Sequence, residues 1–154
     1  MRIKHRLFIL FLFLATLPAV FSSCNPEACF EETNAFLKAT FYSNETKEKK
    51  TPDSLSVTGI GIQDKLYNKQ PGVQPCLLPL DASSGTCSFV IKINDVCDTI
   101  SFIYTSYPHL ISKECGYSFY HRLDTFFCKN DSFYIYKSSD NVTTANEENI
   151  RIFY

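Results

Sequence analysis

Seven cysteines and three histidines are the residues of this 154-residue chain that could do redox, metal or nucleophilic chemistry. No two cysteines have the C-x-x-C spacing of a zinc site, and only two histidines follow the first 23 residues. We therefore predict no metal site and no cofactor, and we expect the cysteines to serve mainly as disulfide partners if the chain is exported. The cysteines are Cys24, Cys29, Cys76, Cys87, Cys97, Cys115 and Cys128.

A thiol nucleophile with a histidine base is the other chemistry that these residue types allow. His121 could act as the base for Cys115. We favour a packed histidine beside a disulfide, because alternation places His121 with Phe119 and Leu123. His109 is expected at the surface. The chain contains no G-x-S-x-G, H-E-x-x-H or P-loop motif, so we predict no catalytic residue.

The acidic residues closest to predicted turns are Asp81, Asp95 and Asp98. A calcium ion needs six to eight oxygen ligands, and no D-x-D-x-D-G loop is present. Aspartate side chains also favour turns by hydrogen-bonding the backbone nearby. Turn chemistry is therefore the better account of these three residues.

The first 23 residues have the order of a secretory signal peptide. Three basic residues, Arg2, Lys4 and Arg6, precede an apolar run from Leu7 to Leu14. Crossing a membrane takes about 20 predominantly apolar residues, which is more than this segment offers. We predict that residues 1–23 are a signal peptide that is removed, and that the protein is exported.

The signal ends in Ser22-Ser23-Cys24, which resembles the lipoprotein signal of bacteria, where small residues precede an acylated cysteine. We predict a lipid on Cys24 that anchors the protein to the outer membrane, in either leaflet. Cleavage after Ser22, giving a soluble protein, is the alternative. Without the three basic residues of the signal, 12 Lys and Arg remain against 16 Asp and Glu. This charge of −4 argues against a nucleic-acid partner, which calls for a basic face.

The mature chain is predicted to be one domain over residues 34–154, preceded by a lipidated leader over residues 24–33. Short apolar or alternating runs recur with turn residues between them, and no dozen-residue window has helical periodicity. Strands are predicted over residues 37–41, 55–62, 65–68, 77–80, 87–94, 98–105, 117–127, 132–137 and 149–154. The predicted fold is all-β, an antiparallel two-layer sandwich of jelly-roll or immunoglobulin-like type, stabilised by disulfides.

The chain contains nine tyrosines and no tryptophan. In the strand over residues 132–137, Tyr134 and Tyr136 alternate with Phe133 and Ile135. Large side chains therefore lie on both faces of that strand. We expect it to be central in a sheet or covered on both sides.

A recurring order of short motifs runs through most of the mature chain. It comprises Asn25-Pro26-Glu27-Ala28-Cys29 with Glu31-Glu32-Thr33, then Pro79-Leu80, Phe89-Val90-Ile91, Asp98-Thr99-Ile100 and Ser112-Lys113-Glu114-Cys115-Gly116-Tyr117. In this order the chain resembles a family of small lipoproteins of unknown function from Bacteroidota. The resemblance implies an envelope compartment and a β-rich fold, but no activity. It also implies that Cys29 and Cys115 are the family-type cysteines, so we predict that they pair.

The remaining four cysteines can be paired on hairpin geometry. A hairpin of strands 77–80 and 87–94 would bring Cys76 near Cys87, within the roughly 7 Å between Cα atoms that a bridge needs. Cys97 and Cys128 are then left for each other. With Cys24 acylated, all six other cysteines would be bridged.

Two kinds of modification signal are present. Asp53-Ser54-Leu55 and Asp98-Thr99-Ile100 look like the short O-glycosylation sites of Bacteroidota, which makes Ser54 and Thr99 candidate sites. Three N-x-[ST] triplets begin at Asn44, Asn130 and Asn141 and would matter in a eukaryotic secreted protein.

Three functions remain open at this stage. The first is a non-enzymatic envelope lipoprotein that presents a binding or assembly surface to another envelope protein or an extracellular ligand. The second is an envelope hydrolase acting on glycan or peptide through a site assembled by the fold. The third is a eukaryotic secreted glycoprotein with a disulfide core.

Overall fold

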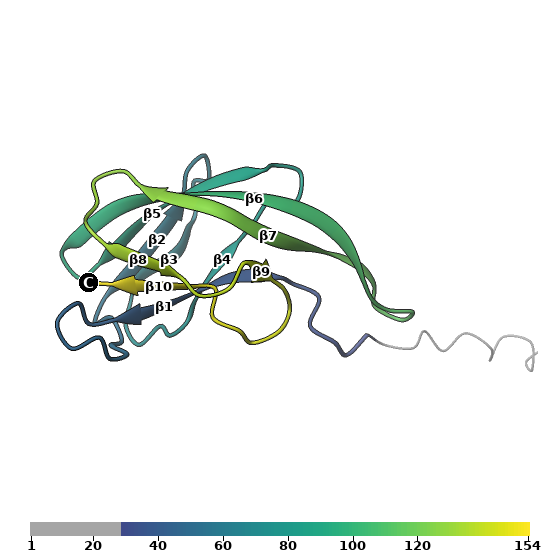
Figure 1. The fold of residues 1–154 in the computed structure, drawn as a ribbon, viewed down its shortest axis with the longest axis horizontal. Coiled ribbons are helices and arrows are strands. Elements are labelled where there is room, and N and C mark those ends of the chain that lie inside the picture. Colours follow the sequence, from purple (N-terminus) through teal and green to yellow (C-terminus); the bar gives the residue numbers. More distant parts are fainter. Residues whose placement is uncertain (1–28) are drawn as a thin grey trace, which may run out of the picture. The chain divides into compact units, whose positions relative to one another are not determined.

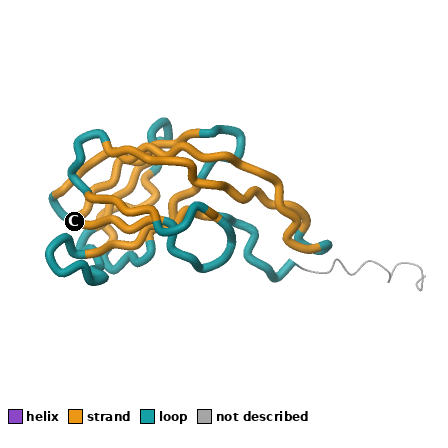
Figure 2. Tube along the Cα trace, viewed as in Figure 1, coloured by secondary structure: helices purple, strands orange, loops and turns teal. Residues whose placement is uncertain are grey.

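Alternation of apolar and polar residues accounts for the regular structure of this protein. The computed structural model describes residues 29–154, so the predicted signal peptide and Cys24 lie outside the described residues. The chain divides into two units, Met1–Phe30 and Glu31–Tyr154, and the fold is that of the second. Figure 2 shows strands and loops in the described part of the chain, which contains no helix able to span a membrane.

Burial in several strands follows the two-residue period that the sequence predicts, although β1 is buried on both faces and β3 is largely exposed. In β2, for example, Leu55 and Val57 are buried while Ser56 between them is half-buried. The strands are β1 Phe36–Tyr42, β2 Leu55–Gly59, β3 Lys65–Gln70, β4 Cys76–Pro79, β5 Thr86–Ile93, β6 Val96–Ser112, β7 Gly116–Cys128, β8 Tyr134–Lys137, β9 Asn141–Val142 and β10 Ile150–Phe153.

The strands form two sheets that pack against each other. Sheet A has the order β4-β1-β10-β8, and sheet B has the order β3-β2-β5-β6-β7-β9 (Figure 1). All strand pairs are antiparallel except β1 with β10, which is parallel. The prediction of an all-β fold with antiparallel sheets packed together is thus confirmed, with one parallel pair in addition.

The hydrophobic core lies between the two sheets. Its largest members are fully buried, and each contributes about 1.5–3 kcal/mol of transfer free energy. They come from strands of both sheets: Leu37, Phe41, Leu78, Ile150 and Ile152 from sheet A, and Leu55, Val57, Ile91, Ile93, Ile100, Phe102 and Leu123 from sheet B.

The predicted hairpin of residues 77–80 with 87–94 is wrong, because its two strands belong to different sheets. β4 pairs with β1, whereas β5 pairs with β2 and β6. The intervening turn carries the chain from one sheet to the other. Tyr104 holds this turn, since its hydroxyl donates to the Asp81 carbonyl at 2.9 Å and accepts from the Asp81 N–H at 3.0 Å.

The predicted bridges Cys76–Cys87 and Cys97–Cys128 are also wrong, because all four residues are free thiols. Cys76 and Cys87 lie in β4 and β5, which share no hairpin. Cys128 lies directly opposite Ile100, on the core side of sheet B. Cys97 stands three residues before Ile100, so its side chain points to the opposite face. Cys97 and Cys128 therefore lie on opposite faces of sheet B and cannot pair.

Among residues 29–154 the structure has one disulfide, Cys29–Cys115. The pairing that the family resemblance implied is confirmed. Cys115 lies in the turn between β6 and β7. On the chain-entropy account, a bridge that closes a loop approaching 100 residues stabilises the folded state by about 4 kcal/mol.

Asp98 organises the turn that follows β7. Its carboxylate is buried and accepts the backbone N–H groups of Thr99 at 2.6 Å, Asn130 at 3.0 Å and Ser132 at 2.8 Å. Burial raises the pKa of Asp98, but these backbone hydrogen bonds outweigh burial and hold the pKa below its usual range. The sequence predicts a turn role for Asp98, and the structure assigns that role to a turn some 30 residues further on.

We expect thiol labelling to separate the four free cysteines. Burial raises the pKa of Cys76 to about 12 and those of Cys87 and Cys128 to about 11, and the thiolate is the reactive form. In a mature chain with Cys24→Ser, dithionitrobenzoate should therefore label the exposed Cys97 first and all four thiols in denaturant. Peptide mapping identifies each site. Fewer than four reactive thiols in denaturant would contradict the structure.

Substitution Asp98→Ala should lower the free energy of unfolding by about 3 kcal/mol at pH 7, since three backbone N–H groups lose their acceptor. Because the folded-state pKa is lowered, this stabilisation is present above the unfolded-state pKa of about 4 and is lost as the pH falls through the folded-state pKa. Urea unfolding of the wild-type and Asp98→Ala proteins at pH 7, 4 and 2 should show that the difference between their free energies of unfolding becomes smaller as the pH falls.

Asp95→Ala is the matched control for Asp98→Ala. Asp95 is an exposed residue of the preceding turn, so its loss should change the free energy of unfolding by less than about 0.5 kcal/mol. A cost for Asp98→Ala that stays constant from pH 7 to pH 2 would show that the carboxylate charge is not the stabilising element.

Candidate functional site

The β6–β7 hairpin extends beyond the strands that flank it. Pairing of β5 with β6 ends at Thr86 opposite Ile103, and β9 pairs with β7 only at His121 and Arg122. The β6–β7 ladder itself continues to Ser112 opposite Gly116. In Figure 1 these two strands run on past their neighbours and curve as they do so. The far half of the hairpin is therefore a two-stranded ribbon.

One face of this ribbon continues the core-facing side of sheet B. Directly paired residues share a face, and the register pairs Tyr104 with Leu123 and Ser106 with His121 on the core side. Two steps further along the same face, Pro108 lies opposite Phe119 and Leu110 lies opposite Tyr117. We call these four residues the hairpin face.

The hairpin face is apolar and exposed. The exposed fraction is 48% for Leu110, 73% for Tyr117 and 49% for Phe119, and Pro108 is exposed as well. On the opposite face of the ribbon, Tyr107 pairs with Tyr120, and His109 stacks on Tyr120 with ring centroids 4.1 Å apart. His109 is exposed, as the sequence predicts.

A hollow of about 220 Å³ lies where the hairpin face meets the sandwich. We call it the root hollow. It is lined by Thr33, Asn34, Ala35, Phe36, Pro79, Leu80, Ala82, Ser118, Phe119 and His121. Phe119 belongs to both the hairpin face and the root hollow, so the two form one continuous surface. Apolar residues outnumber polar ones in the lining of the root hollow. The hollow therefore suits an apolar side chain with a polar tip.

His121 lines the root hollow from the buried side. Its Nδ1 lies 2.9 Å from the Ser106 hydroxyl oxygen, and its ring contacts Tyr104 edge to face with centroids 5.4 Å apart. Burial lowers the pKa of His121, which keeps the ring neutral at pH 7. The arrangement is that of a packed histidine that satisfies a neighbouring hydroxyl, as alternation in the sequence predicts.

The predicted alternative of Cys115 as a nucleophile for His121 is wrong. Cys115 is disulfide-bonded, so it offers no thiolate. Within residues 29–154, no three His, Cys, Asp or Glu side chains gather in a way that could hold a metal ion. The disulfide of Cys115 also excludes a hydrolase that uses this cysteine as its nucleophile.

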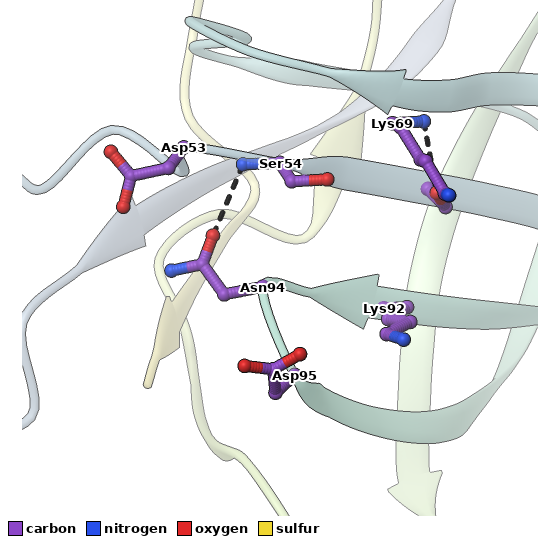
Figure 3. Close-up of a pocket in the computed structure, with 7 residues that line it drawn as sticks. Asp53, Ser54, Lys69, Lys92, Asn94 and Asp95 are labelled. Carbon is purple, nitrogen blue, oxygen red and sulfur yellow. Dashed lines mark hydrogen bonds between the residues drawn. The ribbon is translucent and has the colours of Figure 1, made fainter.

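A second, polar hollow of about 620 Å³ lies beside the ends of β2, β3 and β5. Its lining consists of Asp53, Ser54, Ser56, Lys69, Lys92, Asn94 and Asp95 (Figure 3). The Ser54 N–H donates to the Asn94 side-chain oxygen at 3.0 Å, and the Asn94 N–H donates to the Ser54 carbonyl at 2.8 Å. Asn94 thus serves the turn between β5 and β6, and the mixed charges of the lining select no single ligand.

The two O-glycosylation candidates differ in their surroundings. Ser54 is half-buried at the start of β2, beside the polar hollow. Thr99 is half-buried within β6, where it is paired with Val90 and its carbonyl accepts the Lys129 N–H at 2.9 Å. Ser54 therefore stands at a loop and Thr99 inside a ladder, and the modification stays a prediction for both.

The expectation that the strand of Tyr134 and Tyr136 is covered on both sides is wrong. β8 is an edge strand of sheet A, and these tyrosines are 62% and 52% exposed. They face away from the core, whereas Phe133 is buried and Ile135 packs against the core. In the sequence, two tyrosines two residues apart on one strand predict burial, whereas in the structure they mark an exposed face.

Comparison with known proteins gives a family but no activity. The model of a family of unknown function, DUF6452, matches residues 54–154. This range contains β2 to β10, and with them the β6–β7 hairpin, Cys115 and the two exposed tyrosines of β8. No curated protein and no solved structure matches the chain.

Proposed function

The chain belongs to the family of unknown function DUF6452, and we propose that it is an exported lipoprotein, anchored through Cys24, that binds a partner protein of the cell envelope through the hairpin face. One observation carries this proposal. A set of residues with the alternation of a core strand continues past the sandwich and remains exposed. Contiguous exposed apolar surface on a folded protein marks an interaction site.

The composition of the hairpin face supports a protein partner. Tyr117 and Phe119 are aromatic residues of the kind enriched in protein–protein interfaces. The root hollow next to them, at about 220 Å³, is of a size to take one large side chain. A buried anchor side chain surrounded by flatter contacts is the usual arrangement of a binding hot spot.

The anchor is supported by the sequence and by the disulfide. Ser22-Ser23-Cys24 follows a signal peptide that has no acidic residue. Cys29 and Cys115 are disulfide-bonded. A disulfide also fits an exported protein, because exported compartments are oxidising.

Site-specific photocrosslinking tests the binding role. We expect benzoylphenylalanine at Leu110 or Tyr117 to give one discrete protein adduct after irradiation of cells that make the protein. At Tyr107, which is exposed on the opposite face of the ribbon, the same probe should give none. Adding Phe119→Ala to the Tyr117 probe should reduce the adduct at least tenfold, since loss of a hot-spot residue costs about 2 kcal/mol or more.

Separate controls test binding by the hairpin face and the lipid anchor on Cys24. Equal adducts from positions 107 and 117, or none from positions 110 and 117 at normal protein levels, would contradict the binding role. Metabolic labelling with a fatty acid should mark the wild-type chain and not Cys24→Ser. Mobility should not change after N-glycanase treatment, since a shift would point to the eukaryotic glycoprotein instead.

A further inference from the structure

We infer that the outer face of sheet A at β8 and β10 is a binding site for an uncharged saccharide. This site is separate from the hairpin face, which belongs to sheet B. We call its four residues the tyrosine patch: Tyr134 and Tyr136 from β8, and Arg151 and Phe153 from β10. The register pairs Tyr136 with Arg151 and Tyr134 with Phe153, so all four side chains lie on the same side of the sheet.

The rings of the patch form a row that crosses three strands. Tyr134 and Phe153 have ring centroids 5.6 Å apart, and Phe153 lies 5.3 Å from Tyr42 of β1. Tyr42 is buried at the inner end of this row, whereas Tyr134 at its outer end is 62% exposed. Tyr136 stands two residues along β8, about 7 Å from Tyr134. The exposed rings therefore form a platform on an edge strand.

Arg151 supplies fixed polar groups between the rings. Its guanidinium carbon lies 5.4 Å from the Tyr42 ring and 5.8 Å from the Tyr136 ring. Its Nε donates to Glu148 at 2.5 Å, and the Tyr42 hydroxyl donates to the other Glu148 oxygen at 2.9 Å. Within residues 29–154, no hydrogen bond engages the two terminal amino groups of Arg151, whose side chain is 41% exposed. These amino groups are donors held at the edge of the rings.

The charges of the patch are largely paired within it. Burial raises the pKa of Glu148, but hydrogen bonds from Arg151 and Tyr42 outweigh burial and lower it, so Glu148 is ionised and balances Arg151. Lys137 follows Tyr136 but lies on the other side of β8, where it pairs with Asp140 at 2.7 Å, so it adds no charge to the patch. Lys47 lies 5.1 Å from the centre of the Phe153 ring, and its ammonium donates to the Asn44 side chain. Within residues 29–154 no ion pair neutralises Lys47, so one ammonium remains over Phe153, whereas Arg151 beside the tyrosines is balanced by Glu148.

The exposed tyrosines alone offer less area than a standard protein interface, as do the four residues of the hairpin face without the root hollow, so the chemistry of the patch decides its ligand. An aromatic side chain carries about 150–250 Å² of surface, so two tyrosines exposed by half or slightly more present about 200 Å². A protein partner typically buries about 800 Å² on each side. The patch instead matches one to three sugar rings, since a pyranose presents an apolar C–H face to an aromatic ring and hydroxyl groups at its rim to fixed donors. Flat rings beside paired charges are the chemistry that recognises an uncharged saccharide.

Native affinity electrophoresis tests the site with the full mature chain. The gels contain a neutral polysaccharide, namely hydroxyethylcellulose, starch, dextran, mannan or xylan, or the anionic polygalacturonate. We expect at least one neutral polysaccharide to retard the protein. Tyr134→Ala and Tyr136→Ala should each weaken the binding at least tenfold, because each removes a stacking surface while leaving the core intact. Tyr107→Ala, an exposed tyrosine on the hairpin outside both sites, should bind as the wild type does.

Several outcomes would overturn the assignment. These are no retardation by any neutral polysaccharide, retardation unchanged in both tyrosine variants, or retardation by polygalacturonate alone that 0.5 M salt abolishes. A protein adduct from benzoylphenylalanine at position 136 without saccharide binding would assign the patch to a protein and also overturn it. Since Tyr107→Ala and the tyrosine variants leave the hairpin face intact, failure here does not bear on the proposed partner protein.

Discussion

The antiparallel ladder of β6 with β7 is the constraint on which the rest of this structure depends. Its register fixes which residues face the core, from Ile100 and Phe102 to Leu123. The register shifts by one residue between Ile103 and Tyr104 and is then constant as far as Leu110, so Leu110 and Tyr117 lie on the same side as Tyr104 and Leu123 where the flanking strands have ended. One pattern thus produces a core inside the sandwich and an apolar surface outside it. Turn contacts such as those of Asp98 then fix where the ladder ends.

The sequence predicts the strands well because alternation is a local signal. Nearly every predicted run overlaps an observed strand, including those of β2 and β5, but β6 continues to Ser112, well past the predicted end at residue 105, and β9 is not predicted. The sequence does not predict which sheet a strand joins, because sheet membership depends on pairing between distant residues. The turn after Pro79 illustrates this limit, since a return to the same sheet and a crossing to the other sheet require similar turn residues. Both incorrect disulfide predictions follow from that ambiguity and from the unknown register of Cys97 and Cys128.

In the candidate sites, too, some features follow from the local sequence and others depend on how the strands pair. Burial of His121 follows from its place in an alternating run, and the bonding of Cys115 follows from a family resemblance. Exposure of Tyr134 does not follow, because an edge strand and a central strand carry the same alternation. The tyrosine patch further requires residue 151 to lie opposite residue 136. A functional surface built from paired strands is therefore visible only once the register is known.

The parallel pair β1 with β10 joins the two ends of the described chain at the centre of sheet A. β1 has β4 on one side, but its other edge is filled by the last four-residue strand before Tyr154. Half of this sheet therefore cannot assemble until β10 has emerged from the ribosome and, in an exported chain, from the translocation pore. A chain cut short before β10 would keep an open, aggregation-prone strand edge on β1.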